Sequence, residues 1–194
     1  MSEPRWFTEF ADDHSASYVA RFRRLATEGA DLAGEARLVD AVVAPGARIL
    51  DAGCGPGRIG AELHARGHDV VGVDVDPVLV AAAVADHPGP QWLIADLSEL
   101  DLAGAPFDAA VLAGNVMVFL APGTEARALG RIAAHVRSGG VVITGFALDH
   151  PYRLADFDRD CTTVGLTREH RFAGWDLSPW HDDADWAVTV LRRP

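Results

Sequence analysis

Short β-branched runs alternate with alanine-rich or amphipathic stretches from residue 48 onward. This alternation is typical of a parallel sheet whose strands are joined by crossover helices. Each run is apolar along most of its length, as expected of a strand that is covered on both faces. We therefore predict five parallel strands, at Arg48–Ala52, Asp69–Asp74, Gln91–Ala95, Asp108–Ala113 and Val141–Phe146.

Glycine and proline delimit the connecting helices. Ile59–Arg66 is expected to be a helix that Gly67 ends. Another helix should begin at Pro77 and close before Pro88, with Asp76 as its N-terminal cap. A helix before the fifth strand is predicted by apolar residues at three- and four-residue spacing, namely Leu129, Ile132, Ala133 and Val136.

Both ends of the chain add elements to this core. Two amphipathic helices upstream are predicted by two apolar sets, Tyr18, Phe22 and Leu25, then Leu32, Val39 and Val43. Because the first of these faces has no partner within the strand–helix repeats, we expect a helical cap over residues 1–44. Downstream, Leu166–Trp175 and Trp186–Arg192 have strand composition and predict a terminal antiparallel pair.

Length and composition indicate one globular domain: 194 residues, 49% of them hydrophobic and 23% charged. A net charge of −11 and scattered arginines argue against direct nucleic-acid binding. The chain contains no lysine, which excludes Schiff-base chemistry and a phosphate-loop lysine. With no signal-like start and no long apolar run, we expect a cytoplasmic protein without a membrane partner. Cys54 and Cys161 are expected to be free thiols, and no metal site is predicted.

The first strand runs into a glycine-rich turn that opens the next helix, Asp51-Ala52-Gly53-Cys54-Gly55-Pro56-Gly57. Glycines permit positive φ and close backbone approach, and a helix N-terminus presents free N–H groups. Such a loop suits a bound ligand, although a simple tight turn uses the same residues. The second strand ends 23 positions after Asp51 in Asp74, a carboxylate that can accept hydrogen bonds from both ribose hydroxyls of a nucleoside.

Proteins that bind nicotinamide dinucleotides also have a glycine-rich loop after the first strand and an acid at the end of the second. The ligand could therefore be such a dinucleotide or another nucleoside. The dinucleotide fingerprint requires a third glycine five residues after the first, and Arg58 occupies that position relative to Gly53. A shifted register through Gly55, Gly57 and Gly60 would bury Asp51 within the strand without a partner. The short-chain dehydrogenase version also needs a lysine that the chain lacks.

The segments Ile49–Arg58 and Gly72–Pro77 resemble the class I S-adenosylmethionine-dependent methyltransferases, over about Arg48 to Phe146. The resemblance implies an α/β, Rossmann-like three-layer sandwich with a seven-stranded, mostly parallel sheet, a C-terminal antiparallel strand and an N-terminal helical cap. It implies a single domain over 1–194, with 45–146 as the cofactor-binding core and 147–194 as the substrate side and terminal strand pair. S-adenosylmethionine is the implied cofactor.

By this similarity, Asp51 and Gly53 lie beside the methionine moiety, Gly55 lets the loop pass the cofactor, Asp74 holds the ribose and Val75 packs on adenine. Asp96 and the backbone of Leu97 would bind the adenine edge, although Asp96 also suits a turn. Asn115 is either a contact to cofactor or substrate or a local turn former.

Methyl transfer from a sulfonium requires mainly proximity and orientation, so no fixed catalytic group is predicted. The candidates for a general base are His150, Tyr18 and His14, and His150 is the best placed of the histidines because it follows the fifth strand. Three tryptophans could line a pocket for an aromatic acceptor or simply pack against the sheet, namely Trp175, Trp180 and Trp186.

The sequence therefore predicts transfer of a methyl group to a small-molecule acceptor at oxygen or nitrogen by in-line displacement, in a monomer or homodimer. The alternatives are a nicotinamide-dependent oxidoreductase and a non-catalytic S-adenosylmethionine-binding protein.

Overall fold

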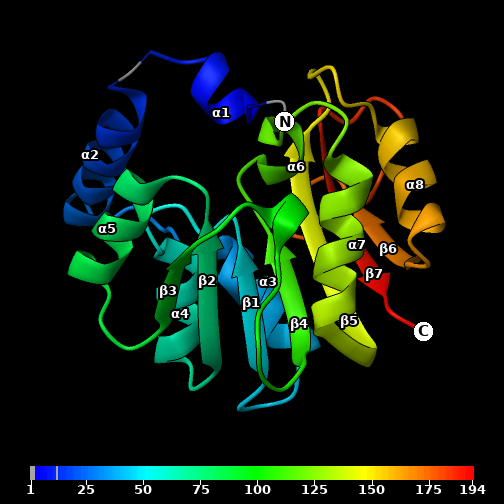
Figure 1. The fold of residues 1–194 in the computed structure, drawn as a ribbon, viewed down its shortest axis with the longest axis horizontal. Helices are drawn as coiled ribbons and strands as arrows, with labels where there is room; N and C mark the ends of the chain where they lie inside the picture. The colour runs from blue at the N-terminus through cyan, green and yellow to red at the C-terminus, as the bar shows by residue number, and fades with distance from the viewer. Residues whose placement is uncertain (1–2, 12) are drawn as a thin grey trace.

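The computed structural model describes residues 3–11 and 13–194, which fold around a seven-stranded sheet (Figure 1). The strands are β1 Arg48–Ala52, β2 Asp69–Asp74, β3 Gln91–Ile94, β4 Phe107–Leu112, β5 Val136–Ala147, β6 Thr167–Phe172 and β7 Trp186–Arg192. Their order is β3-β2-β1-β4-β5-β7-β6, and only β7 runs antiparallel to its neighbours. The predicted fold class is confirmed, with the strand order reversing between β1 and β4.

Helices cover both faces of the sheet (Figure 1). They are α1 Arg5–Thr8, α2 His14–Thr27, α3 Gly34–Val42, α4 Arg58–Ala65, α5 Pro77–Asp86, the 3₁₀ turn η1 Leu97–Glu99, α6 Val116–Phe119, α7 Glu125–His135 and α8 Leu154–Thr163. The expected cap of α5 is present, since the Asp76 carboxylate accepts a hydrogen bond from Val78 N at 2.8 Å.

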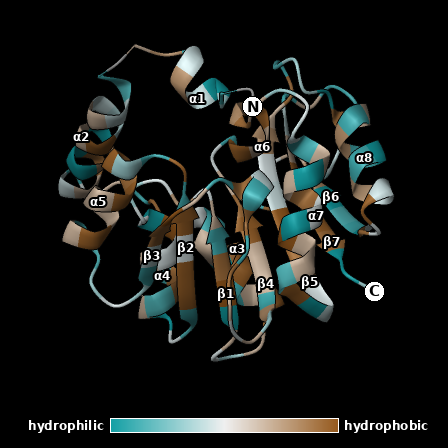
Figure 2. Cartoon of the chain, in the orientation of Figure 1, coloured by the Kyte–Doolittle hydropathy of each residue, from teal (hydrophilic) through white to brown (hydrophobic). Residues whose placement is uncertain are grey.

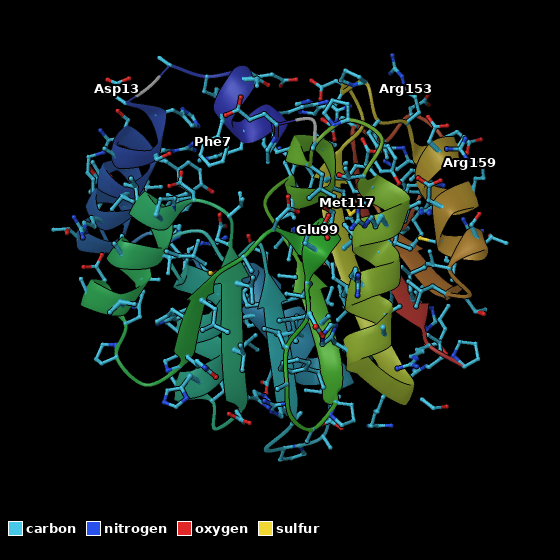
Figure 3. All side chains as sticks on the ribbon, viewed as in Figure 1. Phe7, Asp13, Glu99, Met117, Arg153 and Arg159 are labelled. Carbon is cyan, nitrogen blue, oxygen red and sulfur yellow. The ribbon has the colours of Figure 1, made fainter. Side chains whose placement is uncertain are left out.

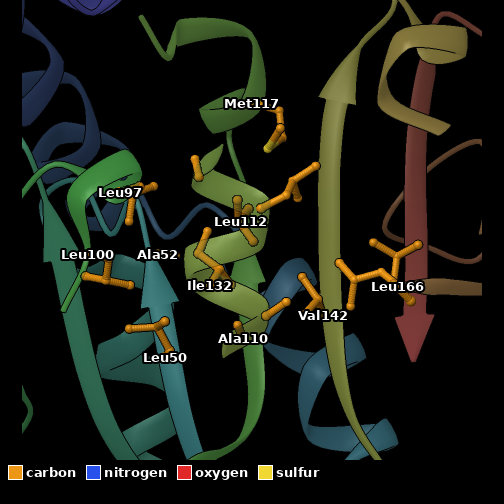
Figure 4. Close-up of a cluster of buried hydrophobic side chains, with 14 of the residues drawn as sticks. Leu50, Ala52, Leu97, Leu100, Ala110, Leu112, Met117, Ile132, Val142 and Leu166 are labelled. Atoms are coloured by element: carbon orange, nitrogen blue, oxygen red, sulfur yellow. The ribbon is translucent and has the colours of Figure 1, made fainter. Parts of the chain in front are cut away.

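The inner strands are apolar because they bury side chains on both sides of the sheet, as the hydropathy colouring shows (Figure 2), whereas the edge strands β3 and β6 contain no buried residue. On one face, Leu50 and Leu112 pack with Ile132 of α7 in a cluster that reaches Phe157 of α8 (Figure 4). On the other face, alternate residues of the same strands pack against α3 and α4. The sheet is thus the middle layer of a three-layer sandwich.

Two expectations about elements differ from the structure. Val136 begins β5 and does not belong to the preceding helix, because it pairs with Phe107 of β4, before an irregularity in the register of the two strands. The second upstream helix, α3, does not belong to a cap over the sheet end: Ala36, Leu38 and Val39 are buried in the core cluster with α4. Amphipathicity predicted that helix but carried no information on which surface it covers.

Within residues 3–11 and 13–194, no helix has the length and apolarity needed to cross a membrane.

Candidate active site

A pocket opens at the carboxyl ends of the parallel strands, at the reversal of strand order between β1 and β4. Figure 1 shows this end of the sheet, with α1 and α6 beyond the strand tips. Ligands of open α/β sheets bind at such a reversal because the loops on either side of it diverge. The loops after β1, β2 and β4 and the start of η1 form the pocket floor. The α1 and α2 helices, together with α6, complete its walls.

The glycine-rich loop after β1 has a backbone that only glycine adopts without strain. Gly53 has φ 81°, and a Cβ there would lie 2.3 Å from the Val116 side chain. Gly57 has φ 83° and is the N-terminal cap of α4. The backbone N–H groups of Gly53 and Cys54 donate to the Val73 carbonyl at 2.7 and 3.0 Å, which fixes the loop against β2.

Asp51 supports this loop from behind. Its side chain is only 1% exposed and accepts a hydrogen bond from Gly60 N at 2.8 Å, which joins β1 to the first turn of α4. Burial raises the pKa of this carboxyl to about 7. The neighbouring loop residues Gly53, Cys54 and Gly55 line the pocket directly.

Asp74 lies at the tip of β2 and faces the pocket, as the motif predicts. Its two oxygens accept hydrogen bonds from Gly55 N at 2.8 Å and from Asp76 N at 2.9 Å. Burial raises the pKa of this carboxyl to about 6. A carboxylate offers about four acceptor positions, so further positions remain for ligand hydroxyls.

The neighbouring strand tip supplies a second acid and an apolar slot. Asp96 accepts from Ser98 N at 2.7 Å and caps η1, while the side chain also lines the pocket. Asp96 therefore has the predicted role in a turn and also presents its carboxylate to the pocket. Val75 and Leu97 line the pocket beside the two acids, and Leu79 of α5 extends this apolar wall.

The helices α1 and α2, named here the N-terminal cover, are tied to the loop after β2 by one carboxylate. Trp6 Nε1 donates to Asp76 Oδ2 at 2.7 Å, and the Ser15 hydroxyl donates to the same oxygen. Arg5 attaches α1 to the α6 side of the pocket. Its guanidinium donates to Glu125 Oε1 at 3.1 Å and to two backbone carbonyls in or just after α6. Figure 3 places Phe7 of α1 and Met117 of α6 at the same end of the molecule.

Arg58, which stands where a dinucleotide-binding loop has glycine, closes one wall of the pocket. Its guanidinium forms a bidentate pair with Glu35 of α3 at 2.6 and 2.8 Å. The same group lies 5.3 Å from the ring of Phe22 on α2. Sequence reasoning missed this pairing because the partners are 23 positions apart and on different helices.

The comparisons with known proteins agree with this geometry. A profile of the methyltransferase domain family matches residues 49–140. The chain is 41% identical to a TehB-like SAM-dependent methyltransferase of Corynebacterium glutamicum. The crystal structure of that protein superposes with a TM-score of 0.90, covering 95% of this chain and 100% of the other. The chain belongs to the S-adenosylmethionine-dependent methyltransferases.

Two curated methyltransferases match over shorter stretches. An uncharacterized methyltransferase of Mycobacterium tuberculosis is 38% identical over 108 residues, covering 54% of this chain and 53% of that protein. The magnesium-protoporphyrin O-methyltransferase of Rhodobacter capsulatus is 34% identical over 113 residues, covering 54% and 48%. The match therefore spans about half the length of these relatives.

S-adenosylmethionine is the cofactor of this methyltransferase family, and the pocket residues fit it. Asp74 is a buried carboxylate with acceptor positions left on the pocket side, and Asp96 Oδ2 has no protein hydrogen-bond partner among the described residues. Val75 and Leu97 form the apolar faces that a purine ring requires. When bound, the cofactor supplies an already activated methyl group.

Asn115 of the methyltransferase is a turn former in this structure. It has φ 72°, and its side-chain oxygen accepts a hydrogen bond from Ala147 N at 2.8 Å. The pocket is lined instead by the residues on either side of it, Gly114 and Val116. The amide therefore braces the loop after β4 against the end of β5.

The three candidate bases differ in position. Tyr18 lines the pocket, and burial raises the pKa of its phenol, so it stays protonated at neutral pH and donates hydrogen bonds. His14 stacks on Phe10 with ring centroids 3.9 Å apart. His150 packs 5.6 Å from the ring of Phe119. Neither histidine is part of the described pocket wall.

The three tryptophans near the C-terminus pack against other parts of the protein. Trp175 fills the space over Gly145, where a Cβ would lie 2.3 Å from its ring. Trp180 lies against the Arg171 guanidinium at 5.5 Å. Trp186 is half-buried against the sheet core. The aromatic residues at the pocket are instead Trp6, Tyr18, Phe22 and Phe119, of which only Tyr18 and Phe22 carry a periodic sequence signal.

Proposed function

We propose that this chain transfers the methyl group of S-adenosylmethionine to a small-molecule acceptor at nitrogen or oxygen by in-line displacement. The observation that carries the proposal is one continuous pocket in which the two acidic strand tips, Asp74 and Asp96, adjoin a space closed by the N-terminal cover. A cofactor and a small acceptor held side by side in one pocket meet the main requirement of this reaction, which is orientation.

Within the proposal, each cofactor residue has a definite task. Asp74 receives the ribose hydroxyls, and Asp96 with the Leu97 backbone receives the adenine edge. Gly53 and Gly55 keep the loop backbone close to the methionine portion. Asp51 holds that loop in shape through Gly60, beside the methionine portion.

Titration calorimetry tests the cofactor assignment. We expect S-adenosylhomocysteine to bind at one site per chain and NAD or NADP to give no binding heat, because Arg58 fills the place of the fingerprint glycine and is paired with Glu35. Tight nicotinamide binding without S-adenosylhomocysteine heat would overturn the proposal.

Two further features complete the proposal. Size-exclusion chromatography should show a monomer or a homodimer. Transfer of radiolabelled methyl from S-adenosylmethionine to any added acceptor would distinguish an enzyme from a non-catalytic binder, since both share the same cofactor residues.

A further inference from the structure

The pocket has two chemically different halves. All three of its charged wall residues, Arg58, Asp74 and Asp96, belong to the half formed by the loops after β1, β2 and β3. The other half, named here the acceptor chamber, lies between the N-terminal cover and α6. The chamber wall consists of Pro4, Trp6, Tyr18, Val116, Phe119 and Leu120. Among these described residues, the Tyr18 hydroxyl is the only side-chain group left to make a hydrogen bond.

The rings of the acceptor chamber hold one another edge to face. Trp6 lies 5.4 Å from Tyr18 at 87° and 5.9 Å from Phe119 at 70°. The single N–H of the Trp6 indole is committed to Asp76. The hydrogen bond therefore fixes the ring in orientation and leaves its carbon surface to the chamber.

We propose that the acceptor chamber binds the methyl acceptor and selects uncharged aromatic molecules. This inference rests on the proposed function and adds the substrate class. A flat neutral ring gains from burial against Val116 and Leu120 and from edge-to-face contact with Trp6 and Phe119.

Both kinds of charged acceptor are disfavoured for separate reasons. An anion meets a protein of net charge −11, and the one basic side chain in the described pocket wall, Arg58, is already paired with Glu35, so the lost hydration of the anion is not replaced. A cation is opposed by the sulfonium beside it, and a protonated amine has no lone pair with which to attack.

The reaction itself is compatible with a neutral acceptor. A lone pair on the acceptor nitrogen or oxygen forms the bond to the methyl carbon while the carbon–sulfur bond breaks and its electron pair goes to sulfur. The positive charge passes from sulfur to the acceptor, and an N–H or O–H proton then leaves to water. Aromatic rings favour a cation near their faces, so Trp6 and Phe119 suit the charge that develops there.

Three matched probes test the charge selectivity: indole and indole-3-acetate on the enzyme loaded with S-adenosylhomocysteine, and indole and tryptamine on the enzyme loaded with S-adenosylmethionine, which carries the sulfonium that opposes a cation. Titration calorimetry or ligand-observed NMR would give their dissociation constants. We expect indole to bind and the two charged analogues to bind at least about tenfold more weakly. A charged analogue that binds as tightly as indole would overturn the selectivity.

The variant Phe119→Leu tests the location. It removes a ring and keeps an apolar side chain, so indole affinity should fall by roughly fivefold or more while S-adenosylhomocysteine affinity stays unchanged. Phe172→Leu on β6, outside the pocket, is the matched control. Should Phe119→Leu fail to fold, Phe119→Met makes the same test, because it also removes the ring and its unbranched side chain fills irregular apolar space.

Unchanged indole affinity in the chamber variant would place the acceptor elsewhere and refute the inference. Failure of the unmodified protein to bind S-adenosylhomocysteine is a different result, which contradicts the proposed function itself.

Discussion

Asp74 shows how one residue serves both loop structure and ligand binding. Its oxygens hold Gly55 N and Asp76 N and still face the pocket. We predict that Asp74→Asn weakens S-adenosylhomocysteine binding by about 1–3 kcal/mol, because a ligand hydroxyl then meets an amide N–H in place of an acceptor. Calorimetry measures the loss. Asp69→Asn, at the exposed start of the same strand, is the control. An unchanged dissociation constant would remove Asp74 from the site.

Asp51 gives a residue-scale prediction about pH. Its folded-state pKa of about 7 lies above the ordinary value of 3.8, so the folded protein keeps a proton that the unfolded chain releases between these values. The stability from this group is therefore complete below about pH 4 and is lost as pH rises through 7. Asn imitates the protonated acid and does not titrate.

We accordingly expect the wild type to lose stability relative to Asp51→Asn by up to about 1.4 kcal/mol per pH unit between pH 4 and pH 7. Urea unfolding of both proteins at pH 5 and pH 8 measures this difference. Asp182→Asn in an exposed loop is the control variant. A difference that is equal at the two pH values would show that Asp51 is not buried as described.

The pocket acids were predictable from sequence, whereas the contacts that complete the pocket were not. Asp74 and Asp96 follow apolar strands, so their places at the sheet end come from strand alternation alone. Trp6 and Asp76 are 70 positions apart in the sequence, so no local residue spacing predicts the hydrogen bond between them. Asn115 had two interpretations from the sequence, and its hydrogen bond with Ala147 N joins residues 32 positions apart, which no local pattern predicts.

At the scale of elements, the N-terminal cover is attached through a few polar bonds and a small apolar cluster, in which Trp6 and Tyr18 pack against Leu79 of α5. Val19 is the one buried residue of α2 among those described, and α1 has none. The bonds of Trp6, Ser15 and Arg5 therefore carry much of the attachment. A segment held in this way is a good candidate to open for ligand exchange.

We predict that Trp6→Phe, which removes the N–H and keeps an aromatic ring, speeds dissociation of S-adenosylhomocysteine by roughly fivefold, the equivalent of about 1 kcal/mol for one hydrogen bond. Stopped-flow fluorescence would measure the rate, with Trp180→Phe as the control.

We also predict that the backbone amides of the N-terminal cover gain protection from hydrogen exchange when the ligand binds. Equal protection of α2 with and without ligand would make it a permanent part of the core.

The elements that sequence patterns located well are those covered on two sides. The strand β1 has its predicted bounds, and so does β2, because continuous apolar runs end where the strands leave the core. The boundary between α7 and β5 was displaced, since Val136 suits both a helix face and a strand. Pattern alone gave α3 an apolar face but left open whether that face covers the sheet or the ligand.

The placement of α3 makes a prediction for the molecule as a whole, because it separates the part of the N-terminus that covers the pocket from the part that belongs to the sandwich. Removal of residues 1–30 deletes the cover and takes little from the sheet core. Removal of residues 1–44 also deletes Ala36, Leu38 and Val39, all buried against α4 and β1, together with the partner of Arg58.

Emptying large buried positions costs about 2–5 kcal/mol each, against a total stability of about 5–15 kcal/mol for a typical domain. We therefore expect the protein without residues 1–30 to unfold cooperatively in urea, with weakened S-adenosylhomocysteine binding, and the protein without residues 1–44 to be largely unfolded. Circular dichroism and urea titration distinguish the two. If both truncated proteins fold equally well, α3 is a cap after all, and the division of the chain at residue 44 is the correct one.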